Sequence, residues 1–194
     1  MTKVTAKPQL GFGEAVKLAM SRLTEIKGRS RRSEYWWAML AYLIFYWIVS
    51  TVAAFVLPYN VAQIVSSLLS LLVLPLTIRR VQDSGHNMLW PVLSFVSGLI
   101  LSLYLALSGV LDMMQSVNPD SDAIAEKCIN PIVIVSTVVT LITSLPTFFF
   151  TLMNSQIGTN KYGESPKYVV ERDFSERNPE RNDFQGRDFE EMKL

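Results

Sequence analysis

The chain has 194 residues, of which 49% are hydrophobic and 18% charged, and its formal net charge is +1. A soluble domain could have this composition, but almost all the charge lies in residues 1–34, 79–86, 112–127 and 161–193. The single cysteine, Cys128, excludes an internal disulfide, and the sequence has no Cys/His cluster that could hold a structural metal.

The N-terminal segment, residues 1–34, is basic and contains one predicted amphipathic helix. Apolar residues recur at helical spacing over about residues 12–27, with charged and hydroxyl side chains on the other face. We expect a helix there that ends at Gly28 and lies in the lipid headgroup region. The basic run Lys27–Arg32 then meets Tyr35–Trp37, aromatic residues typical of a membrane interface.

Residues 35–153 contain four long apolar stretches that are nearly free of charge. An α-helix rises about 1.5 Å per residue, so about 20 apolar residues cross about 30 Å of hydrocarbon. The sequence therefore predicts an all-α, polytopic membrane protein with four transmembrane helices in a compact bundle. The predicted spans are approximately Trp36–Leu57, Val61–Ile78, Met88–Leu111 and Ile132–Met153.

Short loops connect the first three spans. Three residues separate the first span from the second and nine separate the second from the third, so we expect each pair to be neighbours. Pro75 and Pro146 should bend the second and fourth spans. Small residues at i, i+4 spacing mark close helix contacts in lipid, either inside the bundle or on a face for a second copy or a partner helix. They are Ala62, Ser66 and Ser70; Ser94, Gly98, Ser102 and Ala106; and Ser136, Thr140 and Ser144.

The distribution of Lys and Arg predicts the orientation of the spans. Eight basic residues precede the first span, Arg79 and Arg80 begin the second loop, and seven basic residues lie in the C-terminal segment. The third loop, Asp112–Pro131, has four acidic residues against Lys127 alone. Because loops rich in Lys and Arg remain cytoplasmic, both termini and the second loop are expected inside.

The chain after the last span divides into two segments. Residues 154–170 form a cytoplasmic segment that contains an asparagine-tyrosine-glycine motif. Residues 171–194 are strongly charged, with both signs interleaved and few large apolar side chains. This composition predicts a disordered tail over residues 171–194.

Polar residues from three separate segments are predicted to meet at the cytoplasmic face. One interpretation is structural: Asp83 pairs with an arginine, Asp83 or Ser84 caps the third span, and Gly85 makes the turn. The other is a composite site for a phosphate, an anionic lipid headgroup or a protein partner. The candidate residues are Arg29, Arg31, Arg32, Glu34, Arg79, Arg80, Asp83, Asn160 and Tyr162, with Lys161 beside them.

The sequence contains no recognisable set of catalytic residues. Its one histidine, His86, and Cys128 lie on opposite predicted sides of the membrane, and no Gly-rich phosphate loop or HExxH helix occurs. We therefore expect no enzymatic activity, no cofactor, no metal site and no nucleic-acid partner. The leading hypothesis is an accessory or regulatory membrane protein whose partners are the bilayer, including anionic headgroups, and a second copy or another membrane protein. The alternative is an oligomeric transporter or channel for a small solute or lipid, although the spans have only Gln63 besides scattered Ser and Thr as polar residues.

Three motifs, in order along the chain, resemble a known family. Phe12–Trp37, which includes Lys-Gly-Arg-Ser-Arg-Arg-Ser-Glu-Tyr-Trp-Trp, is similar to the opening of the YhaH/YhaI-like bacterial inner-membrane family, domain of unknown function 805. Leu74–Gly85 resembles that family's proline, double-arginine and aspartate segment, and Gly158–Pro166 resembles its asparagine-tyrosine-glycine segment. The resemblance covers about residues 10–168. It implies a location in the bacterial inner membrane and assigns no activity.

Overall fold

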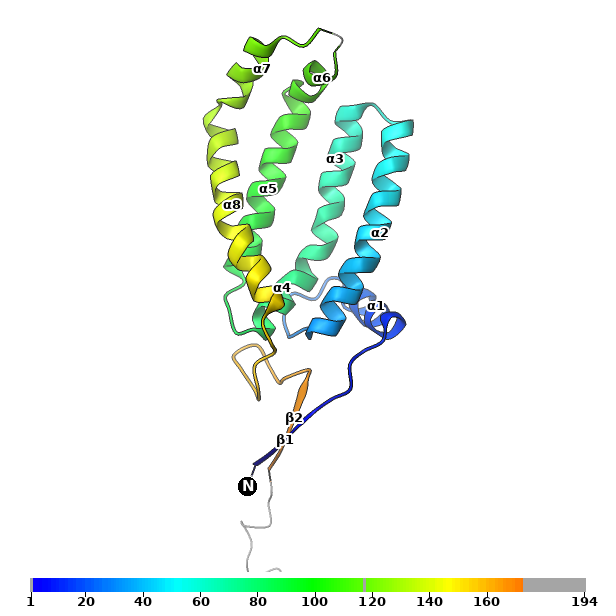
Figure 1. The fold of residues 1–194 in the computed structure, drawn as a ribbon, viewed down its shortest axis with the longest axis vertical. Helices are drawn as coiled ribbons and strands as arrows, with labels where there is room; N and C mark the ends of the chain where they lie inside the picture. The colour runs from blue at the N-terminus through cyan, green and yellow to red at the C-terminus, as the bar shows by residue number, and fades with distance from the viewer. Residues whose placement is uncertain (1, 117, 173–194) are drawn as a thin grey trace, which may run out of the picture.

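The computed structural model describes residues 2–116 and 118–172 as a mainly helical protein (Figure 1). Four helical segments are long and apolar enough to cross a membrane: Arg32–Val56, Tyr59–Asp83, Leu89–Leu107 and Pro131–Leu152. The predicted all-α fold with four membrane spans is confirmed. The elements in chain order are β1 (Thr2–Ala6), α1 (Phe12–Ser21), α2 (Arg32–Val56), α3 (Tyr59–Leu69), the 3-10 helix η1 (Ser70–Val73), α4 (Leu74–Asp83), α5 (Leu89–Leu107), α6 (Val110–Gln115), α7 (Ser121–Cys128), α8 (Pro131–Leu152) and β2 (Tyr168–Arg172).

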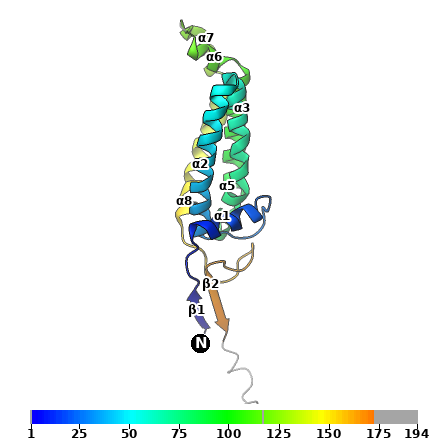
Figure 2. The same cartoon turned by 90° about the vertical axis from the view of Figure 1, so that its right-hand side faces the viewer.

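The spans form a bundle in which the two short loops set the first two pairs of neighbours. α2 packs on α3 as the expected hairpin, α3 packs on α5, and α5 makes its most extensive contact with α8 (Figure 1). α1 lies across the end of the bundle at which α2 begins and α8 ends, and the β1–β2 ribbon lies beyond it (Figure 2). We call this the basic end, because it carries Arg29, Arg31, Arg32, Arg79 and Arg80.

Hydroxyl side chains join the spans inside the bundle. Ser97 on α5 and Thr140 on α8 share a hydrogen bond of 2.8 Å. On α3, Ser67 bonds with Ser102 of α5, and Gln63 donates to the same Ser102 hydroxyl at 3.3 Å. Since Ser102 and Thr140 belong to the predicted small-residue seams, these members of the seams pack inside the bundle.

The second span bends before its end. α3 ends at Leu69, and η1 joins it to α4. Pro75 stands in the first turn of α4 and has no N–H to offer the carbonyl of Leu71, which accepts from the N–H of Leu74 instead. The bend expected at Pro75 is therefore present. It turns α4 into the protein, where every residue from Leu76 to Asp83 is buried.

Several helix boundaries differ from the sequence prediction. The first span begins at Arg32 rather than Trp36, and the second continues to Asp83 rather than Ile78. α1 ends at Ser21 rather than near residue 27, because the carbonyls that follow it bind a buried arginine of α4. The third span ends at Leu107 rather than Leu111, because Gly109 has φ +74° and interrupts the helix before α6 begins.

The two strands were not predicted from the sequence. They pair antiparallel, with Thr2 opposite Arg172 and Ala6 opposite Tyr168. Both strands have β-branched residues at their centres, which favours extended structure. Residues 171 and 172 therefore belong to a strand and not to the predicted tail. The rest of that tail, residues 173–194, lies outside the described residues.

Candidate functional site

Five charged side chains are buried together at the basic end. Arg79, Arg80 and Asp83 are 0% exposed, Glu34 is 1% exposed and Arg29 is 4% exposed. Arg29 comes from the loop after α1, Glu34 from the first turn of α2, and the other three from α4. Taking an ionised group out of water costs several kcal/mol unless the group is paired. The partners of these five residues, which we call the arginine cluster, therefore decide what the cluster can do.

Asp83 is the central acceptor of the arginine cluster. Its Oδ1 accepts from Arg29 Nε at 2.9 Å, and its Oδ2 accepts from Arg80 Nη1 at 2.6 Å. The Ser155 hydroxyl also donates to Oδ2. The pairing expected for Asp83 is thus made with two arginines. Because both carboxylate oxygens bind groups of the same chain, Asp83 is not placed to take a proton from an outside molecule.

Arg29 and Arg80 attach the segment after α8 to the rest of the protein. Arg29 Nη1 donates to the carbonyl of Gly158 at 2.7 Å, and its Nη2 donates to the carbonyl of Gln156 at 2.6 Å. Arg80 Nε donates to the carbonyl of Thr151 at 3.0 Å in the last turn of α8. The last carbonyls of a helix have no partner within the helix. Arg80 therefore completes the C-terminus of α8.

Arg79 holds the loop that follows α1. Its Nη1 donates to the carbonyl of Arg22 and, at 2.8 Å, to that of Glu25, while its Nε donates to the Ser30 hydroxyl at 3.2 Å. Glu34 Oε1 lies 3.9 Å from Arg79 Nη2. This buried Nη2 makes no hydrogen bond within the described residues. The loop carbonyls are used by Arg79, which is why α1 is shorter than its apolar pattern predicts.

The arginine cluster contains more positive than negative charge. Three guanidinium groups lie with two carboxylates, and the other acceptors are neutral carbonyls and hydroxyls. At its edge the exposed Glu25 pairs with Arg22 at 2.7 Å, and this hydrogen bond lowers the pKa of the Glu25 carboxyl. Within residues 2–116 and 118–172, no three His, Cys, Asp or Glu residues are grouped to hold a metal ion. The arginine cluster is therefore a structural joint, in the sense that it binds the loop after α1 and the segment after α8 to α4, and it carries an excess of positive charge.

The turn Asn160–Gly163 attaches the third motif to the second. Asn160 Nδ2 donates to the carbonyl of Gln82 at 3.0 Å, and the Tyr162 hydroxyl donates to the carbonyl of His86 at 3.1 Å. The backbones of Asn160 and Gly163 bond in both directions, at 3.0 and 3.1 Å, with Gly163 at φ +128°. Asn160 and Tyr162 therefore contact the backbone that surrounds the arginine cluster rather than its charged groups.

Arg31, Arg32 and Lys161 lie outside the arginine cluster. Arg31 Nη1 donates to the carbonyl of Pro8 at 2.7 Å, and Arg32 Nη1 lies 3.5 Å from Asn154 Oδ1. Lys161 is exposed, with its Nζ 4.9 Å from the ring centre of the next residue, a tyrosine. The single composite site expected from the sequence is therefore divided into a buried part and a more exposed part.

Two serines that the sequence analysis did not single out belong with the arginine cluster. Ser30 is 0% exposed and donates to Glu34 Oε1 at 2.8 Å, and Ser155 donates to Asp83. Ser30 stands between two arginines of the basic run, which is a weak signal. Nothing in the sequence distinguishes Ser155 from the other serines near the span ends.

Two lysines were also missed. Lys7 and Lys167 line a cavity of about 400 Å³ together with Arg31 and Arg32. The backbone N–H of Lys7 donates to the carbonyl of Lys167 at 2.8 Å, one residue beyond the paired strands. The two lysines meet because the ends of the chain form a ribbon, and no local pattern in the sequence indicates that pairing.

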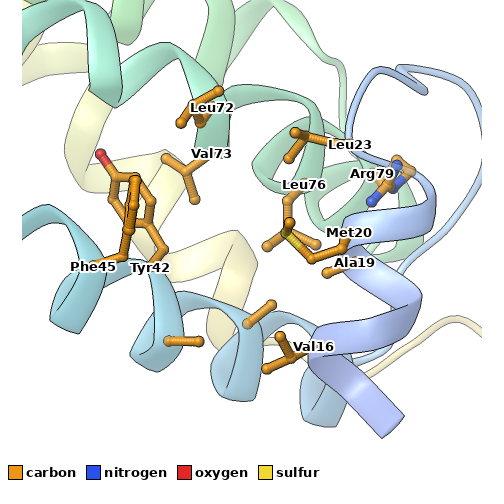
Figure 3. Close-up of a pocket in the computed structure, with 12 residues that line it drawn as sticks. Val16, Ala19, Met20, Leu23, Tyr42, Phe45, Leu72, Val73, Leu76 and Arg79 are labelled. Atoms are coloured by element: carbon orange, nitrogen blue, oxygen red, sulfur yellow. The ribbon is translucent and has the colours of Figure 1, made fainter. Parts of the chain in front are cut away.

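A separate apolar cavity of about 250 Å³ lies between α1, α2 and the second span (Figure 3). Val16 and Met20 of α1 and Tyr42 of α2 line it, and Leu76 comes from α4. Arg79 lies at one end of the cavity, with its Nη1 bound to the loop after α1. The apolar face of α1 thus packs on the bundle, as expected for an amphipathic helix beside a membrane domain.

Comparison with known proteins identifies a family. A family model described as "Protein of unknown function (DUF805)" matches residues 23–164, nearly three-quarters of the chain. The match includes every residue of the arginine cluster and the turn Asn160–Gly163, whereas Lys7 and Lys167 lie outside it. Neither the curated proteins nor the solved structures contain a match to the chain. The chain therefore belongs to the DUF805 family, whose function is unknown.

Proposed function

We propose that this protein is a non-enzymatic accessory or regulatory protein of the bacterial inner membrane, with both termini in the cytoplasm. The closure of the arginine cluster supports this: its five side chains are at most 4% exposed and bind groups of their own chain. A reaction centre keeps its acid, base or nucleophile within reach of a substrate. The cluster instead holds both terminal segments against the bundle, and so builds a defined basic surface for binding.

Native mass spectrometry of the full chain in a mild detergent tests this role. An accessory protein should retain another membrane protein at fixed stoichiometry. Arg29→Gln should lose that partner, because Arg29 binds the carbonyls of Gln156 and Gly158 and so positions the segment after α8. Lys17→Gln, at an exposed position of α1, should keep it. A preparation that contains only this chain, and whose liposomes transport a solute, would contradict the proposal.

Thiol labelling in intact cells tests the orientation. Ser121 begins α7, and Thr159 lies between α8 and β2, at the opposite end of the bundle (Figure 1). In a Cys128→Ser background, Ser121→Cys and Thr159→Cys therefore provide matched thiols at exposed positions on the two sides. A membrane-impermeant reagent should label Ser121→Cys from outside and Thr159→Cys only after the membrane is permeabilised. The reverse pattern would overturn the cytoplasmic assignment of the basic end.

A second candidate function has one supporting observation. A cavity of about 290 Å³ between α2, α3 and α5 is lined by Gln63 and by hydroxyls that include Ser67 and Ser102. Neutral polar groups inside a membrane domain suit an oligomeric transporter or channel for a small solute or lipid. Flux through reconstituted liposomes that is lost in Gln63→Leu and kept in Asp112→Asn would favour this alternative.

A further inference from the structure

Four basic side chains of the basic end surround a cavity without an acidic partner. Lys7, Arg31, Arg32 and Lys167 line the cavity of about 400 Å³, and no Asp or Glu lines it. Within residues 4–116 and 118–170, none of the four makes an ion pair with a carboxylate. Like charges gathered around one space repel each other, so an anion that enters the cavity is attracted by all four.

The two arginines keep most of their hydrogen-bond donors for a ligand. A guanidinium has five N–H donors in a planar fork. Arg31 uses one of them on the carbonyl of Pro8 at 2.7 Å, and Arg32 has one at 3.5 Å from Asn154 Oδ1. The bond to Pro8 holds the Arg31 side chain between the N-terminal segment and α2. Guanidinium forks bind phosphate and carboxylate oxygens in pairs, which a lysine cannot do.

The start of α2 adds to the positive potential of the cavity. Arg31 is the N-cap of α2, with extended backbone and no side-chain hydrogen bond that caps the helix. Arg32 and Ser33, which also line the cavity, are the first helical residues. The free N–H groups of a helix N-terminus attract anions, and α2 is 25 residues long.

Tryptophans place the cavity at the membrane surface. Trp36 and Trp37 line it and are 36% and 41% exposed. Trp37 makes an edge contact with Phe12 of α1 at 5.8 Å, and Trp36 makes one with Phe148 of α8 at 6.5 Å. Tryptophan side chains prefer the headgroup level of a bilayer. We infer that the cavity of Lys7, Arg31, Arg32 and Lys167 binds the phosphate-bearing headgroup of an anionic lipid.

This inference deepens the proposed function. It rests on that proposal for one point, the orientation of the basic end, which makes the lipid one of the cytoplasmic leaflet. The site is formed by segments from near both ends of the chain, because Lys7 directly follows β1 and Lys167 directly precedes β2, at the same end of the ribbon. A headgroup that contacts both lysines should therefore also hold the ribbon against α2. Binding then has a second measurable effect, since the ribbon should become more resistant to protease when the lipid is present.

The test measures lipid binding to the full chain in nanodiscs. Native mass spectrometry should detect phosphatidylglycerol retained in preference to phosphatidylcholine. Lys7→Gln with Lys167→Gln should weaken retention by at least about tenfold, as expected for the loss of charge-assisted hydrogen bonds. Lys17→Gln with Lys27→Gln removes the same charge from exposed positions outside the cavity and should leave retention unchanged. Arg31→Lys with Arg32→Lys should weaken retention, because the charge remains but the planar forks are lost.

Each outcome either supports or overturns the inference. Equal effects in the two lysine pairs, or none in either, would overturn it. Inorganic phosphate that displaces the lipid at equal concentration would assign the cavity to a soluble phosphate and overturn the lipid source. Protease resistance of the ribbon should rise with phosphatidylglycerol in the wild type and not in Lys7→Gln with Lys167→Gln. Lipid binding in nanodiscs does not depend on orientation in the cell, so failure of the thiol-labelling experiment can be distinguished from failure of this one.

Discussion

Asp83→Asn is the sharpest test of the arginine cluster, because the change keeps the shape of the side chain and removes its charge. Arg29 and Arg80, now each within 2.9 Å of a carboxylate oxygen, would face a neutral amide. One of the two Asp83 oxygens would become an NH₂ group that points its donors at a guanidinium or at the Ser155 hydroxyl. Three buried arginines would then share the single carboxylate of Glu34.

Breaking a buried ion pair by removing one partner costs about 3–5 kcal/mol. Asp83 serves two such pairs, whose side chains are at most 1% exposed, so the upper part of that range is expected. For a domain of about 150–250 residues, 1 kcal/mol shifts the Tm by about 2–4 °C. With about 4–5 kcal/mol lost, the Tm of Asp83→Asn in a mild detergent, followed by tryptophan fluorescence, should therefore fall by about 8–20 °C.

Asp112→Asn is the matched control, because this exposed aspartate makes no ion pair within the described residues. It should change the free energy of unfolding by no more than about 0.5 kcal/mol. Arg29→Gln should destabilise strongly on its own, and its effect should not add to that of Asp83→Asn, since the two residues form one pair. A melting curve of Asp83→Asn that matches wild type would refute the view that the cluster is a structural joint.

Three further substitutions test single contacts around the cluster by the same melting assay. Tyr162→Phe removes the hydrogen bond to the carbonyl of His86 and should lower the free energy of unfolding by about 0.5–1.5 kcal/mol, with no change meaning that this bond is not maintained. Gly85→Ala places a Cβ at φ +86° and should cost about 1–2 kcal/mol, whereas an equal or higher Tm would contradict that backbone conformation. Arg80→Lys keeps the charge but cannot bind Asp83 and the Thr151 carbonyl with one planar fork, so it should cost about 1.5–3 kcal/mol; full rescue by lysine would show that charge alone matters.

The membrane spans could be predicted because the bilayer sets their length and excludes charge from them. The pairing of Asp83 could be predicted for a related reason, since a carboxylate among arginines next to lipid needs a charged partner. Which arginine pairs with Asp83 could not be predicted from the sequence. Arg29 and Arg31 stand two residues apart in one basic run, yet Arg29 is 4% exposed and Arg31 lines an open cavity.

The single residue that separates these two arginines, Ser30, explains the difference through a contact with a distant part of the chain. The N–H of Ser30 donates to the carbonyl of Arg79 at 3.2 Å, and α2 begins directly after Arg31. The first of these contacts depends on α4, nearly fifty residues later in the chain. The β1–β2 ribbon is harder still to predict from the sequence, because its strands lie at opposite ends of the described chain. Strand propensity over five residues is too weak a signal to indicate such a long-range pair.

Buried ion pairs are weak contributors to stability, because apolar side chains of similar volume can be as favourable. The arginine cluster is therefore better explained by the geometry it imposes. Ser30 is bonded through its N–H, its hydroxyl and its carbonyl to residues of the cluster. These bonds fix the backbone directly before Arg31, which is the N-cap of α2 and lines the cavity. The buried arginine cluster thus positions the exposed basic residues that line the cavity. A role as a binding surface is consistent with both parts of the basic end.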